Sequence, residues 1–192
     1  NLIGNRNQVA KELAKKFLAL GMKIIVFVEN PAQANSLVKQ LDGEIGLQSY
    51  PATLQRKIRS IYEELGNANC TYIKDEMGAV PHHSLLLPEE RHVMETLFRG
   101  KHDIMVATAT LAQGVNLPVD VVLIAGEDRY DVDKDGRGQM DAHEILNAAG
   151  RAGRAGFRSQ GAAILVSNSV IGIQNNELTD AWFSLKNNIF SK

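Results

Sequence analysis

Two arginines follow glycines in the segment LNAAGRAGRAG, just before an apolar run. If residues 141–154 form a helix, Arg151 and Arg154 share one of its faces, and Gly150 and Gly153 form a smooth stripe beside them. A planar guanidinium can hold a phosphate through two hydrogen bonds, and glycine lets another surface approach the backbone closely. The pattern is therefore typical of a phosphate clamp at an interface. It is also typical of a helix that ends in glycine with solvated arginines, and the spacing alone leaves both interpretations open.

A second polar segment, VATATLAQGVNLP (106–118), joins two apolar runs. It begins at the carboxyl end of the first run, which is where open α/β sheets place their ligands. Its polar and turn-forming residues are Thr108, Thr110, Gln113, Gly114 and Asn116. These residues are candidates for ligand contacts, although an ordinary turn between two strands would have a similar composition.

The elements that must position these segments follow from the hydrophobic pattern. Continuous apolar runs predict buried strands over 23–29, 103–109, 120–126 and 161–167. Amphipathic periodicity predicts helices over 9–20, 31–43, 51–65 and 87–100, and the terminal segment 177–190 is typical of a closing helix. Strands that alternate with helices in this way predict an α/β fold of three layers, in which helices cover both faces of a parallel sheet.

Finer signals set the boundaries of these elements. Asn30 and Pro31 are a helix N-cap and a proline in the first helical position. Leu20 and Leu65 continue the apolar stripes of their helices, and 127–140 is expected to be a loop. Residues 66–80 carry no clear pattern.

Composition limits the classes of function. The chain has 192 residues and 44% hydrophobic residues, which suits a single domain with a proper core. The net charge of −1 means that any contact with nucleic acid must be local or shared with another domain. One cysteine excludes an internal disulfide, and no apolar run is long enough to span a bilayer. The chain begins without methionine and has no GxxxxGK[ST] phosphate loop, so we expect it to be a fragment of a longer protein.

A metal site is not expected. The loop 131–142 imitates an EF-hand at its first positions, but Ala142 stands where the bidentate glutamate is needed. The five histidines show no ligand spacing, and His82 and His83 would point to opposite sides of a strand. Cys70 has no evident base beside it and is expected to be a small buried hydrophobe.

Taken in order, the segments resemble the second RecA-like domain of a superfamily 2 helicase. KIIVFVEN resembles motif IV, and GAVPHHSLLLPEERHVMETLFRGKHDIMVATATLAQGVNLPVDVVLIAG resembles the run through motifs IVa, V and Va. NAAGRAGRAG resembles motif VI. The amino-acid sequences of these motifs are most similar to the superkiller-like DExH-box group, and the resemblance covers roughly residues 20 to 170.

The resemblance implies a nucleotide site shared with a first RecA-like domain that this chain lacks. In such helicases ATP, with Mg²⁺, lies between the two domains, and motif VI faces the γ-phosphate. Arg151 and Arg154 match the arginine fingers that stabilise charge on the transferring phosphoryl group. The other positions matched to the nucleotide side are Gly114, Asn116, Asn147 and Gly150. Asn147 replaces the usual glutamine and is one methylene shorter.

The resemblance also implies a nucleic-acid partner, single-stranded RNA or DNA. Thr108 matches a threonine that contacts the nucleic-acid backbone, and Asn30 is a weaker candidate for the same contact. Contacts of this kind make binding salt-dependent and largely independent of sequence. We expect one helicase C-terminal domain over residues 1–192, in a cytoplasmic protein without a membrane partner, and we expect the chain alone to hold no ATP or Mg²⁺ and to be inactive.

Two alternatives are weighed against this interpretation. A helicase-like module kept only for docking or nucleic-acid binding would need neither Arg151 nor Arg154. A Rossmann-like domain for a small molecule should carry its glycine-rich loop after the first strand, but NPAQ follows that strand here.

Overall fold

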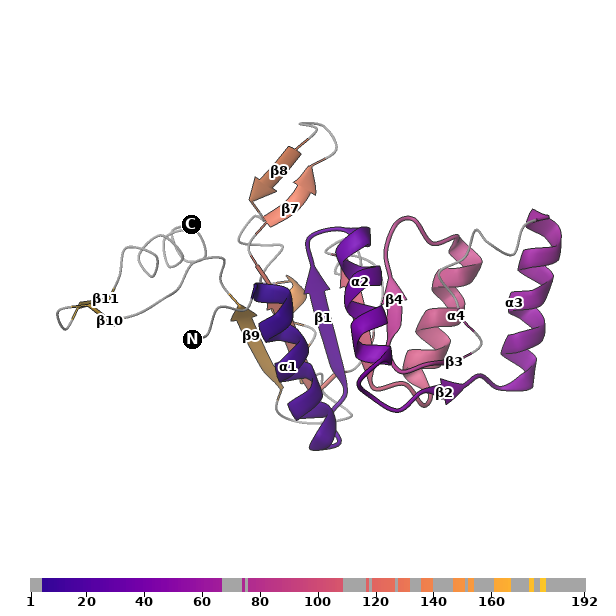
Figure 1. Cartoon of the computed structure of the whole chain (residues 1–192), viewed down its shortest axis with the longest axis horizontal. Coiled ribbons are helices and arrows are strands. Elements are labelled where there is room, and N and C mark those ends of the chain that lie inside the picture. Colours follow the sequence, from indigo (N-terminus) through magenta and orange to yellow (C-terminus); the bar gives the residue numbers. More distant parts are fainter. Residues whose placement is uncertain are drawn as a thin grey trace.

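A computed structural model describes residues 5–66, 74, 76–108, 117, 119–126, 128–131, 136–139, 147–150, 152–153, 161–166, 173–174 and 177–178. Its centre is a five-stranded sheet in the order β4-β5-β1-β6-β9, with every neighbouring pair parallel (Figure 1). The strands are β1 (Ile24–Val28), β4 (Val80–His82), β5 (Ile104–Thr108), β6 (Val121–Ala125) and β9 (Ala162–Val166). The four predicted strands are thus confirmed, and they join a fifth strand that the sequence pattern did not indicate.

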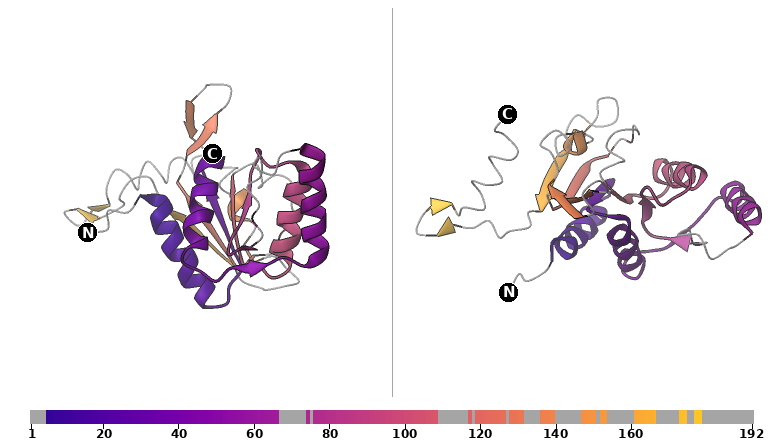
Figure 2. Two further views of the ribbon diagram at one scale, coloured as in Figure 1. Left: turned by 45° about the vertical axis from the view of Figure 1, so that its right-hand side comes forward. Right: turned by 90° about the horizontal axis from the view of Figure 1, so that it is seen from above.

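Helices cover both faces of this sheet. They are α1 (Arg6–Ala19), α2 (Pro31–Asp42), α3 (Ala52–Leu65) and α4 (Pro88–Arg99). α1 packs on β6 and β1, and α2 packs on β5 and β4. The chain passes from β1 to β4 through α2 and returns from β4 to β5 through α4, so right-handed crossovers put α2 and α4 on opposite faces. Figure 2 shows α1 and α2 on one side of the strands and α4 on the other. The predicted three-layer α/β fold of the RecA-like type is confirmed.

The hydrophobic core lies around the three central strands. β1, β5 and β6 are buried along their whole length, as their continuous apolar sequences predict. β9 differs, because Ala162 and Ala163 are exposed. Among the described residues, β9 is the last strand of the sheet and pairs with β6 alone, so an apolar sequence alone overestimates its burial.

The fifth strand, β4, begins at Val80, the last of the residues without a clear pattern. Three residues long, it carries Pro81 at its centre. Proline cannot donate to a ladder and is found on edge strands, and β4 is the edge strand next to β5. A two-stranded ladder of β2 (Gln48–Ser49) and β3 (Glu76–Met77) precedes it.

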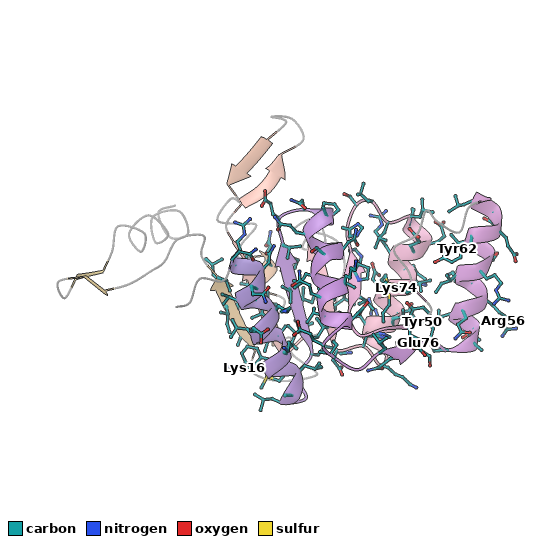
Figure 3. All side chains as sticks on the ribbon, viewed as in Figure 1. Lys16, Tyr50, Arg56, Tyr62, Lys74 and Glu76 are labelled. Atoms are coloured by element: carbon teal, nitrogen blue, oxygen red, sulfur yellow. The ribbon has the colours of Figure 1, made fainter. Side chains whose placement is uncertain are left out.

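Two expectations about leucines are wrong. Leu20 is 68% exposed, because α1 ends at Ala19 and the C-cap backbone no longer follows the helical stripe. Leu65 is also exposed, at the last position of α3, a helix that packs mainly against α4. Tyr62 of α3 lies between these two helices in Figure 3, where it contributes to the core.

The segment 127–140 is not a simple loop. β7 (Asp128–Asp131) and β8 (Gly136–Gln139) form an antiparallel ladder, which follows the carboxyl end of β6 (Figure 1). Glu177 and Leu178, expected to begin the closing helix, lie in β11 (Glu177–Leu178) and pair with β10 (Ile173–Gln174). The remaining residues 179–190 of the expected closing helix lie outside the described residues, as does Cys70.

Candidate nucleotide and nucleic-acid site

The carboxyl edge of the sheet brings together the two residues expected to contact nucleic acid. Val28 and Thr108 are partners in the parallel register of β1 and β5, and Asn30 follows Val28 by two residues. Thr108 ends β5 and is 6% exposed. Asn30 and Thr108 therefore lie at the same edge, as their positions after apolar runs predict.

Asn30 also has a structural duty. Its Oδ1 accepts a hydrogen bond from the backbone N–H of Gln33 at 3.0 Å, and Pro31 stands in the first helical position. The predicted N-cap is thus confirmed. Because the oxygen serves the helix, the amide NH₂ is the group of Asn30 with capacity to donate toward a phosphate. The amino end of α2 adds a favourable field for an anion at this edge.

A polar cluster that the sequence analysis missed holds the first turns of α1 and α2 together. Arg6 forms an ion pair with Glu29, the residue after β1. Gln33 Nε2 donates to Glu29 Oε2 at 3.0 Å, and Asn7 Nδ2 donates to Gln33 Oε1 at 3.2 Å. The cluster fixes the helix end that carries Asn30. Its only sequence signal is an acidic residue at the end of an apolar strand.

Two histidines at the end of β4 complete this edge. His82 Nε2 bonds to Glu95 Oε1 of α4 at 2.9 Å, and His83 Nε2 bonds to Asn35 Oδ1 of α2 at 2.9 Å. The adjacent side chains reach helices on opposite faces, as predicted for neighbours on a strand. Burial lowers the pKa of His82, and it lowers the pKa of His83 to about 4, with His82 as a second cause. A neutral histidine offers no positive charge to attract a nucleic-acid phosphate. The role of His82 and His83 is therefore to connect β4 with the helices on both faces of the sheet.

The described part of motif VI lies at the other end of the sheet. Ala152 forms a parallel bridge with Val119, and the N–H of Gly153 donates to the carbonyl of Val119 at 2.9 Å. Val119 precedes β6, and Ala162, the first residue of β9, donates to the carbonyl of the neighbouring Asp120 at 2.9 Å. Ala152 and Gly153 therefore lie at the amino edge, whereas Asn30 and Thr108 lie at the carboxyl edge. Strands of five residues separate the two edges by about 17 Å.

Of the two interpretations left open for residues 141–154, the described residues favour a helix that ends in glycine. Asn147 to Ala149 are helical, Gly150 lies in a turn, and Gly153 has φ of 66°. The chain leaves the helix before Ala152, because this residue pairs with Val119 instead. Whether Arg151 and Arg154 share a face lies outside the described residues.

The remaining candidate residues divide into two groups. Asn147 and Gly150 are exposed, and the neighbouring Ala148 is fully buried. Because Ala148 anchors this segment in the core, the exposed Asn147 and Gly150 are suitably placed to contact a ligand or another domain. Gly114, Asn116, Arg151 and Arg154 lie outside the described residues. Within the described ranges, no group of three or more His, Cys, Asp or Glu could hold a metal ion, and no helix has both the length and the apolar character to cross a membrane.

Comparison with known proteins identifies the family. The helicase conserved C-terminal domain matches residues 53–156. The RQC trigger complex helicase SLH1 of Saccharomyces cerevisiae is 40% identical over 91 residues, which are 47% of this chain and 5% of that protein. The human U5 small nuclear ribonucleoprotein 200 kDa helicase is 39% identical over 92 residues, 47% of this chain and 4% of that protein.

A third relative matches a longer part of the chain. Activating signal cointegrator 1 complex subunit 3 of Dictyostelium discoideum is 28% identical over 167 residues, which are 85% of this chain and 8% of that protein. The chain thus corresponds to a small part of each relative. By its profile match, its sheet and its relatives, the chain belongs to the helicase C-terminal domain family, as a second RecA-like domain of the superkiller-like group of superfamily 2.

Proposed function

We propose that residues 1–192 form one domain of a longer ATP-dependent nucleic-acid helicase or translocase. The observation that carries this proposal is the family match over residues 53–156. It spans every candidate position except Asn30, on a RecA-like sheet. In this proposal a first RecA-like domain of the same protein binds ATP and Mg²⁺, because the sequence of this chain has no GxxxxGK[ST] phosphate loop. The single cysteine and the family favour a cytoplasmic location.

The catalytic contribution of this chain is charge stabilisation from across a cleft. Arg151 and Arg154 bind the γ-phosphate oxygens and stabilise the charge that develops as the phosphoryl group leaves. Asn147, Gly150, Gly114 and Asn116 contact the nucleotide from the same side. The residue types suit phosphate, because guanidinium groups bind phosphate through two hydrogen bonds and the arginines directly precede and follow Ala152 and the turn residue Gly153 in the sequence. Mg²⁺, when bound, neutralises the β- and γ-phosphates.

The nucleic-acid contribution lies at the opposite edge of the sheet. The hydroxyl of Thr108 donates a hydrogen bond to a backbone phosphate. The amide NH₂ of Asn30, at the amino end of α2, donates a second one. The partner is single-stranded RNA or DNA. RNA is favoured by a further relative, the DExH-box ATP-dependent RNA helicase DExH12 of Arabidopsis thaliana, which is 36% identical over 91 residues, 47% of this chain and 4% of that protein.

The separation of the two edges explains how hydrolysis could drive movement. The segment after Thr108 leads to Gly114 and Asn116 and then to Val119, which binds Gly153. One stretch of chain therefore connects the nucleic-acid edge with the nucleotide edge. Opening and closing of the cleft around ATP would move both edges together relative to the first domain.

The test compares ATP hydrolysis by the isolated chain and by the full-length protein, each with and without single-stranded RNA or DNA. We expect no hydrolysis by the isolated chain and stimulated hydrolysis by the full-length protein. Normal ATPase turnover by the clean isolated chain would refute the division of labour between two domains. Nucleic-acid binding by a full-length protein with no ATPase activity would instead support a docking or binding module.

A further inference from the structure

Gly161 lies directly against the described backbone of motif VI. It comes just before β9, and its nearest neighbours outside its own stretch of chain are backbone atoms of Ala152 and Gly153. A Cβ at position 161 would lie 2.1 Å from the nitrogen of Gly153 and 2.4 Å from the carbonyl carbon of Ala152. Both distances are far below van der Waals contact, so no side chain fits without moving this backbone.

Val119 also holds the same segment. The N–H of Gly153 donates to the carbonyl of Val119 at 2.9 Å, and Ala152 pairs with Val119 as in a parallel ladder. Ala152 and Gly153 therefore lie in a backbone seat to which both Val119 and Gly161 contribute. Neither neighbour can yield as a flexible side chain would, because each is backbone that leads directly into a sheet strand, β6 or β9.

The position of Ala152 and Gly153 constrains the backbone from which two arginine side chains extend. Arg151 and Arg154 are the residues immediately before and after Ala152 and Gly153. Because the chain is continuous, a displacement of Ala152 and Gly153 is transmitted to both neighbouring arginines. Misplacement of catalytic groups by about 1 Å can slow an enzyme about 100-fold.

We propose that Gly161 is a positioning residue for ATP hydrolysis, which acts by allowing the backbone of motif VI to settle against the start of β9. The proposal rests on the proposed function of Arg151 and Arg154 as arginine fingers. It assigns to Gly161 a role in the transition state and none in the binding of ATP or nucleic acid.

The experiment introduces Gly161→Ala into the full-length protein and measures nucleic-acid-stimulated ATP hydrolysis. We expect kcat to fall by about 10- to 100-fold. The KM for ATP and the affinity for single-stranded nucleic acid should stay within about threefold, since ground-state contacts are made elsewhere. An equal rise in KM with unchanged kcat would contradict the proposal.

Two control variants separate positioning from general effects of substitution. Gly46→Ala adds the same methyl group where no atom lies within 4 Å, so its kinetics should match the wild type. Leu37→Ala opens a cavity at a fully buried position of α2, remote from motif VI. It should lower the melting temperature with kcat close to normal at a temperature where the protein is folded. If Leu37→Ala loses as much kcat as Gly161→Ala, loss of stability explains both and the proposal falls.

A triple variant tests whether Gly161 acts through the arginines. In a background that carries both Arg151→Ala and Arg154→Ala, Gly161→Ala should reduce kcat by less than threefold, because both groups that it positions are gone. If the losses multiply fully, Gly161 does not act through the arginines. If Gly161→Ala does not fold, Gly153→Ala replaces it under the same criteria, since an alanine is strained at φ of 66° in the same seat.

The single variants also distinguish failure of the inference from failure of the proposed function. Normal hydrolysis by Arg154→Ala would overturn the proposed function itself. Loss of hydrolysis in Arg154→Ala together with normal kinetics in Gly161→Ala would overturn only the positioning role.

Discussion

At the scale of single residues, the side chains at the carboxyl edge of the sheet divide between contact and support. Thr108 and Asn30 end apolar strands or follow them closely, so they face the edge where ligands meet a parallel sheet. His82, His83 and Glu29 lie at the same edge but are engaged with α4, α2 and Arg6. The match to the helicase motifs and the shared edge make Thr108 and Asn30 the proposed contacts for nucleic acid.

Replacement of Thr108 by valine tests its proposed contact. Valine keeps the shape of the side chain and removes the hydroxyl, so the affinity for single-stranded nucleic acid should fall by about tenfold, the equivalent of a hydrogen bond to a charged group worth about 1.5 kcal/mol. The loss should be similar for all nucleic-acid sequences. Fluorescence anisotropy with labelled single strands measures it. Thr96→Val, at an exposed position of α4, is the matched control. Equal affinities in the two variants would exclude Thr108 from the contact.

The buried histidines predict that acid destabilises the chain. Burial lowers the pKa of His82, His83 and His102 below the ordinary value of 6.5, in the case of His83 to about 4. Between these pH values the unfolded chain binds protons that the folded chain does not, so stability is full above about pH 6.5 and declines as the pH falls toward 4. Each histidine can contribute up to about 1.4 kcal/mol per pH unit within its own window.

Urea unfolding of the chain at pH 7.5 and pH 5 measures this decline. The variant His83→Gln should reduce the pH dependence, because one titrating group is lost and the amide can still bond to Asn35. His92→Gln, at an exposed position of α4, serves as the control. A pH profile of unfolding that is identical in His83→Gln and the wild type would show that His83 does not contribute to it.

At the scale of elements, the start of α2 has two duties that substitutions can separate. Asn30 caps the helix through Oδ1, so Asn30→Ala should lower the free energy of unfolding by about 1 kcal/mol, and Asn30→Ser should change it by only a few tenths. Serine keeps the cap but lacks the amide. If Asn30→Ser binds nucleic acid as well as the wild type, Asn30 is a helix cap alone. Equal stability of Asn30→Ala and wild type would contradict the cap.

Much of this element pattern could be predicted from the sequence, because local signals and tertiary packing agree. The cap at Asn30, the proline after it and the apolar positions of α2 all specify the same helix. β4 could not be predicted, since three residues with a central proline carry too little pattern. The β7 and β8 ladder was missed because main-chain hydrogen bonds hold it, whatever the polarity of its side chains.

The site follows the same division. The edge that carries Asn30 and Thr108 is predictable, because the carboxyl ends of parallel strands meet there. The cluster of Arg6, Glu29 and Gln33 depends on residues more than twenty positions apart, which no local pattern reveals. The sequence left open whether the helix continues to 154 or ends in glycine, because its alanines favour a helix and its glycines favour an end; the bridge between Ala152 and Val119 decides for the end.

At the scale of the whole molecule, the two proposed sites lie at opposite edges of the sheet, one strand length apart. Asn30 and Thr108 mark the carboxyl edge, and Ala152 and Gly153 mark the amino edge. A rigid sheet between the two transmits movement without unfolding, since its central strands are buried throughout. The chain is thus suited to form one side of a cleft between two domains, with the nucleotide and the nucleic acid bound at separate edges.

The central claim is that motif VI of this chain completes an ATP site on another domain. The most direct test is ATP hydrolysis by the full-length protein, with single-stranded RNA present, in the wild type and in Arg154→Ala. We expect turnover by the variant to fall on the order of 10³-fold, with ATP affinity within a few-fold, because an arginine finger acts mainly on the transition state. Normal turnover by Arg154→Ala would contradict the claim and would leave GRAGRAG as a structural turn at the end of a helix.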